Sequence, residues 1–150
     1  MISWRCVAFD DLTVPELYKI LAARAEVFVV EQTCPYQDLD NHDQQGWHLL
    51  GEAKSGELAA YLRILPPGEK YTEAAIGRVL TSASFRGTGI GRVLVSQGIA
   101  QCEGLYPNAG IRISAQAHLE KFYGSLGFQT VSDVYDEDGI PHIEMLCPPA

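Results

Sequence analysis

Residues 86–91, Arg-Gly-Thr-Gly-Ile-Gly, have the residue types and spacing best suited to holding a phosphate group. An apolar run at residues 76–80 precedes them, and a helix-like segment at residues 90–103 follows. Glycines let the backbone fold back on itself and approach a ligand closely. Several amide N–H groups can then point into one concavity, where the N-terminus of the next helix adds partial positive charge. The order strand, glycine-rich turn and helix therefore predicts a phosphate site, with Arg86 and Arg92 as flanking cations.

Three known motifs can be compared with this stretch. A Walker A loop needs Lys and then Ser or Thr after its second glycine, whereas Gly91 is followed by Arg92 and Val93. A dinucleotide fingerprint needs G-x-G-x-x-G and an acidic residue about 20 residues further on, and neither is present. The pattern Arg/Gln-x-x-Gly-x-Gly/Ala matches Arg86, Gly89 and Gly91, and it resembles the pyrophosphate loop of the GNAT N-acetyltransferase superfamily. An ordinary glycine-rich turn without a ligand is the alternative.

A second segment, residues 116–128, resembles the end of a GNAT domain, where a short helix carries an aromatic pair followed by Gly-Phe. The two segments have the order and separation found in that superfamily, and the resemblance covers most of residues 45–147. Residues 28–38 and the tail at residues 138–142 are similar to the ElaA-like branch of the superfamily. The matching residues of the second segment are Phe122, Tyr123, Leu126, Gly127 and Phe128.

Apolar periodicity and turn residues predict the elements that must position these motifs. A capping box formed by Thr13 and Glu16 begins a helix that runs to about Val30. Residues 31–46 are polar and read as a long loop, of a kind that is often functional, and its acidic residues are expected to be solvated. Strands are expected at residues 2–8, 47–52, 58–65, 74–80, 111–114, 128–135 and 142–147, and further helices at residues 90–103 and 117–125.

The order of these elements predicts the fold class. Strand, helical region, three strands, helix, strand, helix and two strands imply an α/β fold with a mixed sheet covered by helices. The helix at residues 90–103 is apolar nearly all round and is expected to be largely buried against that sheet. The resemblance implies the GNAT-like acyl-CoA N-acyltransferase fold. Its central sheet is mostly antiparallel with a splayed parallel pair, helices lie on both faces, and acyl-CoA enters between the splayed strands.

The composition restricts the class of protein. The chain has 150 residues, 47% hydrophobic and 20% charged, which predicts a single N-acetyltransferase domain over residues 1–150 once the resemblance is taken into account. A net charge of −8 argues against nucleic acid as a partner, and no apolar run approaches the roughly 18 residues that a membrane helix needs. Cys6, Cys34, Cys102 and Cys147 are far apart, which indicates neither a metal site nor a disulfide framework. A reduced, cytoplasmic protein without a metal is expected.

The resemblance implies that acetyl-CoA is the co-substrate. The glycine loop then holds the pyrophosphate, and the strand segment before it pairs with the pantetheine arm and polarises the thioester carbonyl. Gln116 stands where family members often have a polar side chain against the cofactor; an exposed amide at a helix start is the alternative. Unlike many family members, this chain has no proline at residues 82–85, just before the loop. The expected cofactor-binding residues are Val79, Leu80, Thr81, Arg86, Gly87, Thr88, Gly89, Ile90, Gly91 and Gln116.

Acetyl transfer to an amine needs a neutral nucleophile. A lysine-like amine with a pKa of about 10.4 loses its proton at a cost of roughly 4–5 kcal/mol at neutral pH. The leaving thiolate benefits from a nearby acid, and the resemblance makes Tyr123 the candidate; an ordinary aromatic core pair with Phe122 is the alternative. Glu31 is the candidate base, because a carboxylate beside Phe28 and Val30 is expected to have a raised pKa. A solvated acid at the helix end is its alternative.

The histidines are weaker candidates for the base. His118 lies nearest the aromatic pair, whereas His48 and His142 lie in expected strands, where a histidine is more often structural. A water chain to solvent could serve instead.

Together these features predict an N-acetyltransferase that moves an acetyl group from acetyl-CoA to a primary amine by direct attack. The acidic body favours a cationic acceptor, either a small molecule or a peptide. Two alternatives stay open: a non-catalytic acetyl-CoA sensor that regulates a partner protein through residues 31–46, and a small structural domain without a ligand. Dimers are common in the superfamily, so the resemblance is also compatible with a homodimer.

Overall fold

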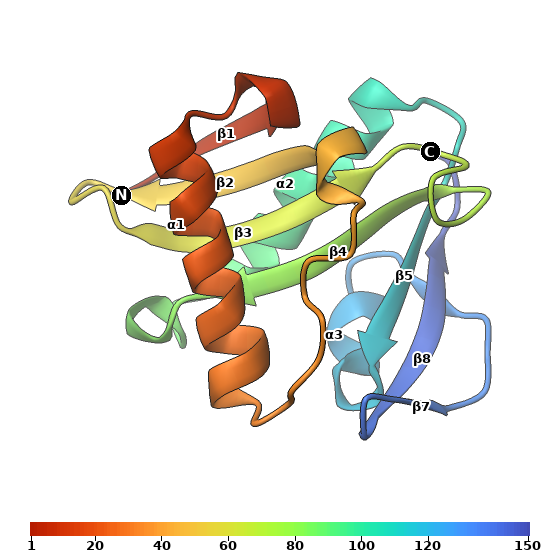
Figure 1. Ribbon diagram of the computed structural model, residues 1–150. Coiled ribbons are helices and arrows are strands. Elements are labelled where there is room, and N and C mark those ends of the chain that lie inside the picture. The colour runs from red at the N-terminus through yellow and green to blue at the C-terminus, as the bar shows by residue number, and fades with distance from the viewer.

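A single eight-stranded sheet runs through the computed structural model, which describes residues 1–150 (Figure 1). The strands are β1 (Ile2–Ala8), β2 (Trp47–Ala53), β3 (Leu58–Leu65), β4 (Ala74–Thr81), β5 (Ile111–Gln116), β6 (Gln129–Thr130), β7 (Tyr135–Glu137) and β8 (Ile140–Cys147). The helices are α1 (Val14–Arg24), α2 (Ile90–Leu105) and α3 (Glu120–Gly124). The strands follow the order β1-β2-β3-β4-β5-β8-β6, and β7 also pairs with β8.

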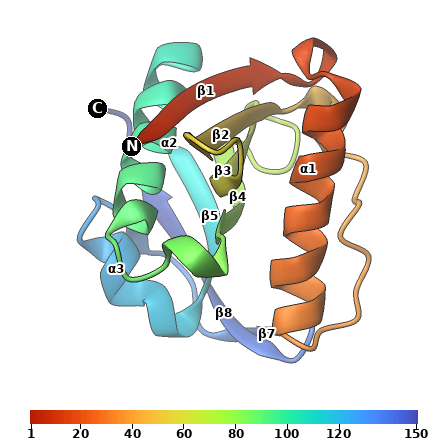
Figure 2. The ribbon, with the colours of Figure 1, turned by 90° about the vertical axis from the view of Figure 1, so that its left-hand side faces the viewer.

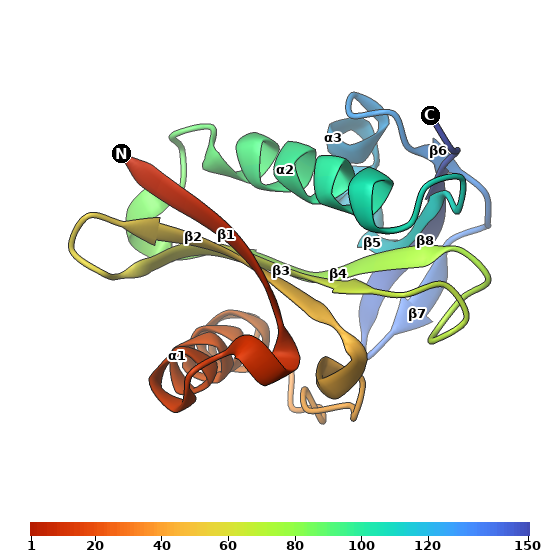
Figure 3. The same ribbon diagram turned by 90° about the horizontal axis from the view of Figure 1, so that it is seen from above.

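Helices cover both faces of the sheet (Figure 2 and Figure 3). α1 lies against one face, and α2 and α3 lie against the other. The larger apolar core lies between α2 and the sheet, and every residue of the central strand β3 is buried. A smaller core, which includes Ile20 of α1 and Tyr61 of β3, lies on the opposite face. The expected mixed sheet with helices on both faces is confirmed.

The sheet splits where β4 meets β5. These two strands are parallel and pair only at their beginnings, Ala74 with Ile111 and Ala75 with Arg112. Beyond that point β4 continues along β3, whereas β5 pairs with β8. The edge of β4 over residues 76–81 is therefore left without a strand partner on the side that faces β5. The splayed parallel pair that the resemblance implied is confirmed.

A bulge lies in β4 beside this split. Arg78 has a φ of +52°, and the pairing between β3 and β4 shifts between Tyr61 and Arg63. A bulge bends a strand and changes the direction in which its side chains point. The Arg78 side chain consequently reaches the loop before β2, where it contacts Asp38 and Asp40.

The hydrogen-bonding pattern of the first helix changes at its end. The capping box is present, because Thr13 Oγ1 accepts from the Glu16 amide at 3.2 Å and Glu16 Oε1 accepts from the Thr13 amide at 2.9 Å. α-helical bonding ends at Arg24, however, and Ala25–Glu31 form a π-helical turn. π turns are often found at functional sites, and this one reaches the gap between β4 and β5 with Phe28.

Three other expectations about the elements were wrong. α2 is buried along one face only, with Val93 45% exposed, because it packs on the sheet surface and has solvent behind it. The single strand expected over residues 128–135 is replaced by β6 and β7, since most side chains between them are exposed and give the chain no buried face. β8 begins at Ile140, two residues earlier than expected. None of the helices combines the length and apolar character needed to cross a membrane.

An ionic network holds the long loop before β2 against the sheet. Asp43 lies at its centre and accepts hydrogen bonds from Arg24 at 2.7 Å and Arg63 at 2.9 Å. Arg24 also donates to Asp38, and Arg63 to Asp40, each at 2.9 Å. The two arginines are 0% and 1% exposed, so these carboxylates replace the water that each guanidinium has lost. The expectation that these acids are solvated was wrong, because sequence spacing did not reveal which arginines face the loop.

Arg78 completes this network from β4. Its Nε lies 2.8 Å from Asp38 Oδ1, and its Nη2 lies 3.2 Å from Asp40 Oδ2. The guanidinium also lies over the Tyr36 ring, 5.6 Å from its centroid, in a cation–π contact. Three aspartates of one loop thus meet arginines of α1, β3 and β4. The network fixes the loop beside the gap between β4 and β5.

Acid is expected to weaken this network. Burial disfavours the charged forms of Asp40 and Asp43, but arginines outweigh burial and hold the pKa of both carboxyls below its usual value. Arg63 and Arg78 act on Asp40, and Arg24 and Arg63 act on Asp43. A lowered folded-state pKa adds stability above the unfolded value of about 3.9, and this stability is lost as the pH falls through the folded pKa. We expect the urea midpoint to fall steeply below about pH 4, and less steeply in Asp43→Asn. A parallel decline in both proteins would contradict this assignment.

Candidate active site

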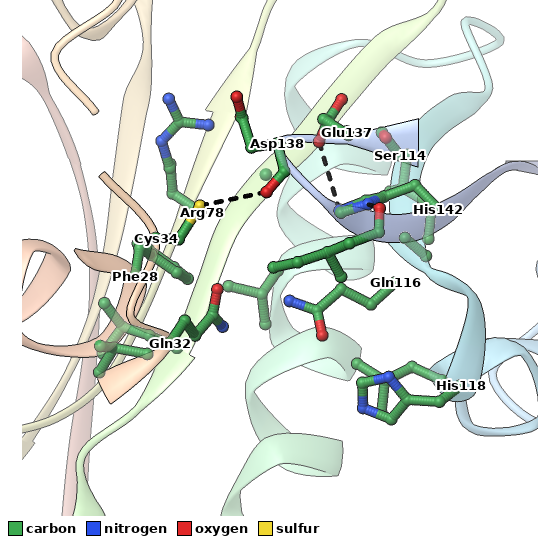
Figure 4. A pocket seen from close by; sticks show the side chains of 18 of the residues that line it. Phe28, Gln32, Cys34, Arg78, Ser114, Gln116, His118, Glu137, Asp138 and His142 are labelled. Carbon is green, nitrogen blue, oxygen red and sulfur yellow. Dashed lines mark hydrogen bonds and ion pairs between the residues drawn. The ribbon is translucent and has the colours of Figure 1, made fainter. Parts of the chain in front are cut away.

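The gap between β4 and β5 holds a cleft of about 560 Å³. Its walls come from β4, β5, the π-helical turn with the loop after it, and the turn between β7 and β8. Figure 4 shows Phe28 and Gln32 on one side, facing Gln116 and His142 on the other. This volume is within the range of about 300–1,000 Å³ that is usual for small-molecule sites. The cleft lies along the unpaired edge of β4, so a ligand inside it can reach main-chain groups.

The glycine loop lies at the end of β4, beside this cleft. Gly87 and Gly89 have φ values of +79° and +82°, in the left-handed region that favours glycine. No turn or loop hydrogen bond uses an amide of residues 87–92 as its donor. α2 begins at Ile90, so the free amides of its first turn belong to the same group. Free N–H groups at a helix N-terminus form an anion-binding arrangement, and a diphosphate fits it.

The two arginines of this region have different partners. Arg86 Nε donates to the Thr81 carbonyl at 3.0 Å, and its Nη2 lies 2.7 Å from Glu31 Oε1. Arg86 is therefore held over the end of β4, at the edge of the cleft. Arg92 Nη1 instead donates to Ser125 Oγ at 2.8 Å and links α2 to the end of α3. Of the two expected cations, Arg86 is the one that lines the cleft.

The expected cofactor-binding residues fall into two groups. Val79, Leu80, Thr81, Arg86 and Gln116 line the cleft. Gly87, Thr88, Gly89, Ile90 and Gly91 form the turn just beyond Arg86 and are not part of the cleft lining.

The unpaired edge of β4 explains why residues of this strand line the cleft. In an unpaired strand edge, main-chain N–H and C=O groups alternate and stay available to an extended ligand. The bulge at Arg78 adds a local break in the pairing with β3. Gln116, at the end of β5, points into the cleft from the opposite wall (Figure 4).

Tyr123 lies on α3 at the buried side of the cleft, 7% exposed. Its ring packs edge to face with Phe122 at 5.1 Å and with Phe128 at 5.8 Å between centroids. Burial raises the pKa of Tyr123 to about 12, so the phenol is protonated at neutral pH. The side chain thus has both properties considered from sequence: it belongs to an aromatic cluster, and it also lines the cleft.

Glu31 lies at the end of the π-helical turn. Its carboxylate forms the ion pair with Arg86, and its side chain is 29% exposed. Sequence reasoning did not predict this cation, which reaches the carboxylate because the loop at the end of β4 comes back beside the helix. The role of Glu31 as base stays a prediction.

Sequence reasoning named one residue at the far end of the cleft, His142, and only as a weaker candidate base. Cys34, Tyr36, Glu137, Asp138 and His142 line it, from the loop after the π-helical turn and from the β7–β8 hairpin. The two segments touch where Cys34 Sγ lies 3.6 Å from the Asp138 carbonyl oxygen (Figure 4). The segments are too far apart in sequence for any spacing rule to join them. The one available signal was the similarity of the tail at residues 138–142 to the ElaA-like branch.

The splayed parallel strands, the bulged β4 and the glycine loop at the start of α2 together define an acyl-CoA N-acyltransferase fold. The family model described as "Acetyltransferase (GNAT) domain" matches residues 16–148. The chain belongs to the GNAT acetyltransferase family and, within it, to the ElaA-like branch.

The relatives support the assignment to the ElaA-like branch. The chain is 46% identical to the protein ElaA of Escherichia coli over 147 residues, which cover 97% of this chain and 95% of ElaA. The crystal structure of E. coli ElaA has a TM-score of 0.91 with this chain at 44% identity, covering 97% of this chain and 99% of that one. A crystal structure described as an acyl-CoA N-acyltransferase from Pseudomonas aeruginosa has a TM-score of 0.93 at 44% identity, with the same coverage. The resemblance stated from sequence is confirmed.

Proposed function

We propose that this protein transfers the acetyl group of acetyl-CoA to a primary amine, which attacks the thioester directly. The observation that carries the proposal is the run of free amides at residues 87–92, beside Arg86, at the end of the unpaired edge of β4. Such amides suit a diphosphate, and an unpaired strand edge suits an extended arm that contains amide groups. Coenzyme A has both parts. Membership of the GNAT family supports the same conclusion.

The cleft residues then divide between binding and chemistry. The amides of the glycine loop and Arg86 hold the diphosphate, and the segment Val79–Thr81 pairs with the pantetheine arm. A main-chain N–H of that segment polarises the thioester carbonyl, and Gln116 contacts the arm from the opposite wall. Tyr123 donates a proton to the leaving sulfur. Because Tyr123 is buried among aromatic rings, a thiolate beside it is poorly solvated and binds a proton more strongly.

Direct attack is favoured over an acetyl-enzyme. Cys34 is the cysteine that lines the cleft, and its thiol is directed to the Asp138 carbonyl. A nucleophilic cysteine needs an adjacent base or cation that generates its thiolate. A carbonyl oxygen supplies neither, so no covalent intermediate is required.

The acceptor is proposed to be a cationic primary amine, either a small molecule or a peptide. The protein has a net charge of −8, which favours the approach of a cation. A cytoplasmic location and a homodimer are kept as further proposals. All four cysteines are free thiols, which is compatible with a reducing compartment.

A panel of primary amines assayed for release of coenzyme A tests this function. The panel contains alkyl diamines, lysine peptides and peptides with free N-termini, each with saturating acetyl-CoA. Amine-dependent release of coenzyme A is expected with at least one of these classes. Tight binding of acetyl-CoA without turnover of any amine would instead favour the non-catalytic sensor. Absence of any thermal shift with acetyl-CoA would exclude both functions.

Glu31→Gln separates the two roles open to this side chain. If Glu31 only neutralises Arg86, its removal frees the arginine for the diphosphate. The pair is partly exposed, so the expected gain in acetyl-CoA affinity is at most about 1 kcal/mol, or roughly fivefold in Kd, measured by calorimetry. If Glu31 is the base, kcat falls by about 10²-fold or more. Glu26→Gln, in the same turn and exposed, is the matched control and is expected to change neither quantity.

A further inference from the structure

His142 occupies a position in the cleft that suits a base. It lies on β8 opposite Gln116 of β5, is 8% exposed, and lines the far end of the cleft (Figure 4). Its Nδ1 lies 2.8 Å from the Ile140 carbonyl oxygen. A carbonyl oxygen only accepts, so Nδ1 carries a hydrogen in the neutral as well as in the protonated imidazole. In the neutral imidazole the lone pair therefore belongs to Nε2, which is the arrangement that a proton acceptor needs.

A carboxylate lies beside that nitrogen. Glu137 Oε2 is 3.3 Å from His142 Nε2, and the Glu137 side chain is 49% exposed (Figure 4). The Tyr135 ring stacks on the imidazole, with 6.2 Å between centroids and 29° between planes. Stacking restricts the orientation of the ring. Because Glu137 is partly solvated, it can also attract an incoming ammonium ion and bring it next to Nε2.

The charges around the far end of the cleft support the same conclusion. The one arginine there, Arg78, is already paired with Asp38 and Asp40. Glu137 and Asp138 add negative charge at this end, and the charge that opposes them comes from Lys70 of the β3–β4 loop, which interacts electrostatically with Glu137. The titratable and charged groups on the elements around His142 are Tyr135 and Glu137 of β7, Asp138 of the turn, Glu144 of β8, His118 and Tyr123 near α3, Cys34 and Arg78 across the cleft, and Lys70 and Tyr71 of the β3–β4 loop.

We propose that His142 is the general base that deprotonates the acceptor amine, with Glu137 as the positioning residue that stabilises the resulting imidazolium. This inference rests on the proposed acetyl transfer. His142 Nε2 takes one proton from the ammonium, and the neutral amine attacks the thioester carbonyl. The C–N bond forms and the C–S bond breaks. Tyr123 protonates the leaving sulfur and recovers its proton from the amide nitrogen, while His142 releases its proton to solvent.

The other candidate bases are placed less well. His48 is fully buried, with its two ring nitrogens bound to the Tyr61 hydroxyl at 2.7 Å and the Asp43 carbonyl at 3.0 Å. His118 lines the cleft but is exposed, and no hydrogen bond fixes its tautomer. Glu31 is occupied by Arg86. Among these groups only His142 combines a fixed tautomer, a lone pair next to the cleft and a carboxylate partner.

The pH dependence of His142→Asn tests this proposal. The asparagine amide can still donate to the Ile140 carbonyl from the place of Nδ1, whereas the atom that accepts the proton is lost. With the alkylamine that the wild type acetylates fastest, kcat/KM at pH 7 is expected to fall by about 10²–10⁴-fold. The loss is expected to shrink towards pH 10, because an alkylamine near its pKa of about 10.4 no longer depends on a base. The Kd for acetyl-CoA is expected to be unchanged.

Three further variants make the outcome decisive. Glu137→Gln is expected to give a smaller loss with the same recovery at high pH. His42→Gln changes a histidine outside the cleft and is the matched control, with an unchanged profile expected. His142→Gln is measured as well, so that misfolding of the asparagine variant does not decide the result.

The results that would contradict the proposal can also be distinguished from one another. A pH profile of His142→Asn and His142→Gln parallel to that of the wild type would overturn His142 as the base. So would the same pH-dependent loss in Glu31→Gln or His118→Gln alone. If the wild type acetylates no amine at all, the proposed function itself fails, and this inference fails with it.

Discussion

Asp43→Asn is expected to lower the free energy of unfolding by about 3–5 kcal/mol, because it breaks a buried ionic network at its centre. Asp43 accepts hydrogen bonds from two arginines that are 0% and 1% exposed, Arg24 and Arg63. Asparagine fills nearly the same volume but carries no charge. Each arginine is then left with one carboxylate in surroundings where water cannot replace the other. For a chain of this length, the change corresponds to a fall in Tm of about 6–20 °C.

Urea unfolding monitored by circular dichroism measures this effect, with Asp133→Asn as the control. Asp133 is exposed and belongs to no ion pair, so its replacement is expected to stay within about 0.5 kcal/mol of the wild type. The Kd of folded Asp43→Asn for acetyl-CoA is expected to be unchanged, since the glycine loop lies outside the network. An unchanged urea midpoint would mean that water enters the network and compensates the arginines.

Tyr123→Phe is expected to lower kcat by about 10²–10⁴-fold, the usual contribution of a positioned proton donor. The phenol has its pKa raised to about 12 by burial, so it holds its proton until a stronger base arrives. A thiolate that forms in the same buried surroundings is such a base, because burial raises the pKa of a thiol as well. Without the hydroxyl, the sulfur must leave as an unprotonated thiolate or take its proton from water.

The same substitution is expected to leave folding and binding nearly intact. Burial accounts for the raised pKa of the Tyr123 hydroxyl, with no hydrogen bond contributing, while the ring contacts Phe122 and Phe128. Phenylalanine keeps those contacts, so the Tm and the Kd for acetyl-CoA are expected to stay close to those of the wild type. Tyr18→Phe, at a tyrosine that is 77% exposed, controls for loss of a hydroxyl elsewhere. Full turnover by Tyr123→Phe would remove the tyrosine from the mechanism.

Features set by neighbouring residues could be predicted from sequence. The capping box at Thr13 and Glu16 depends on two residues three positions apart, and it is present. The glycine loop depends on left-handed positions that glycine favours, and Gly87 and Gly89 adopt them. The order of strands and helices followed from periodicity and turn residues, and it was sufficient for the fold class. The prediction of one strand in the β6–β7 region was wrong because its side chains have no buried face, so periodicity carried little information there.

Features set by distant residues could not be predicted. The ion pair between Glu31 and Arg86 joins residues 55 positions apart, and the contact between Cys34 and Asp138 joins residues 104 positions apart. The place of His142 depends on the pairing of β8 with β5 and β7 together. No local pattern distinguishes such a histidine from a structural one in a strand.

By itself, the sequence determined that a strand, a glycine turn and a helix would form an anion site, because backbone conformation and helix capping are local properties. It also determined the family, because two motifs stand in the right order. Only the tertiary structure decided which side chains line the cleft, which arginines meet the three aspartates, and which histidine lies beside a carboxylate. The reason is physical: burial and electrostatic interaction depend on distance in space, and the folded sheet brings together segments that the chain keeps far apart.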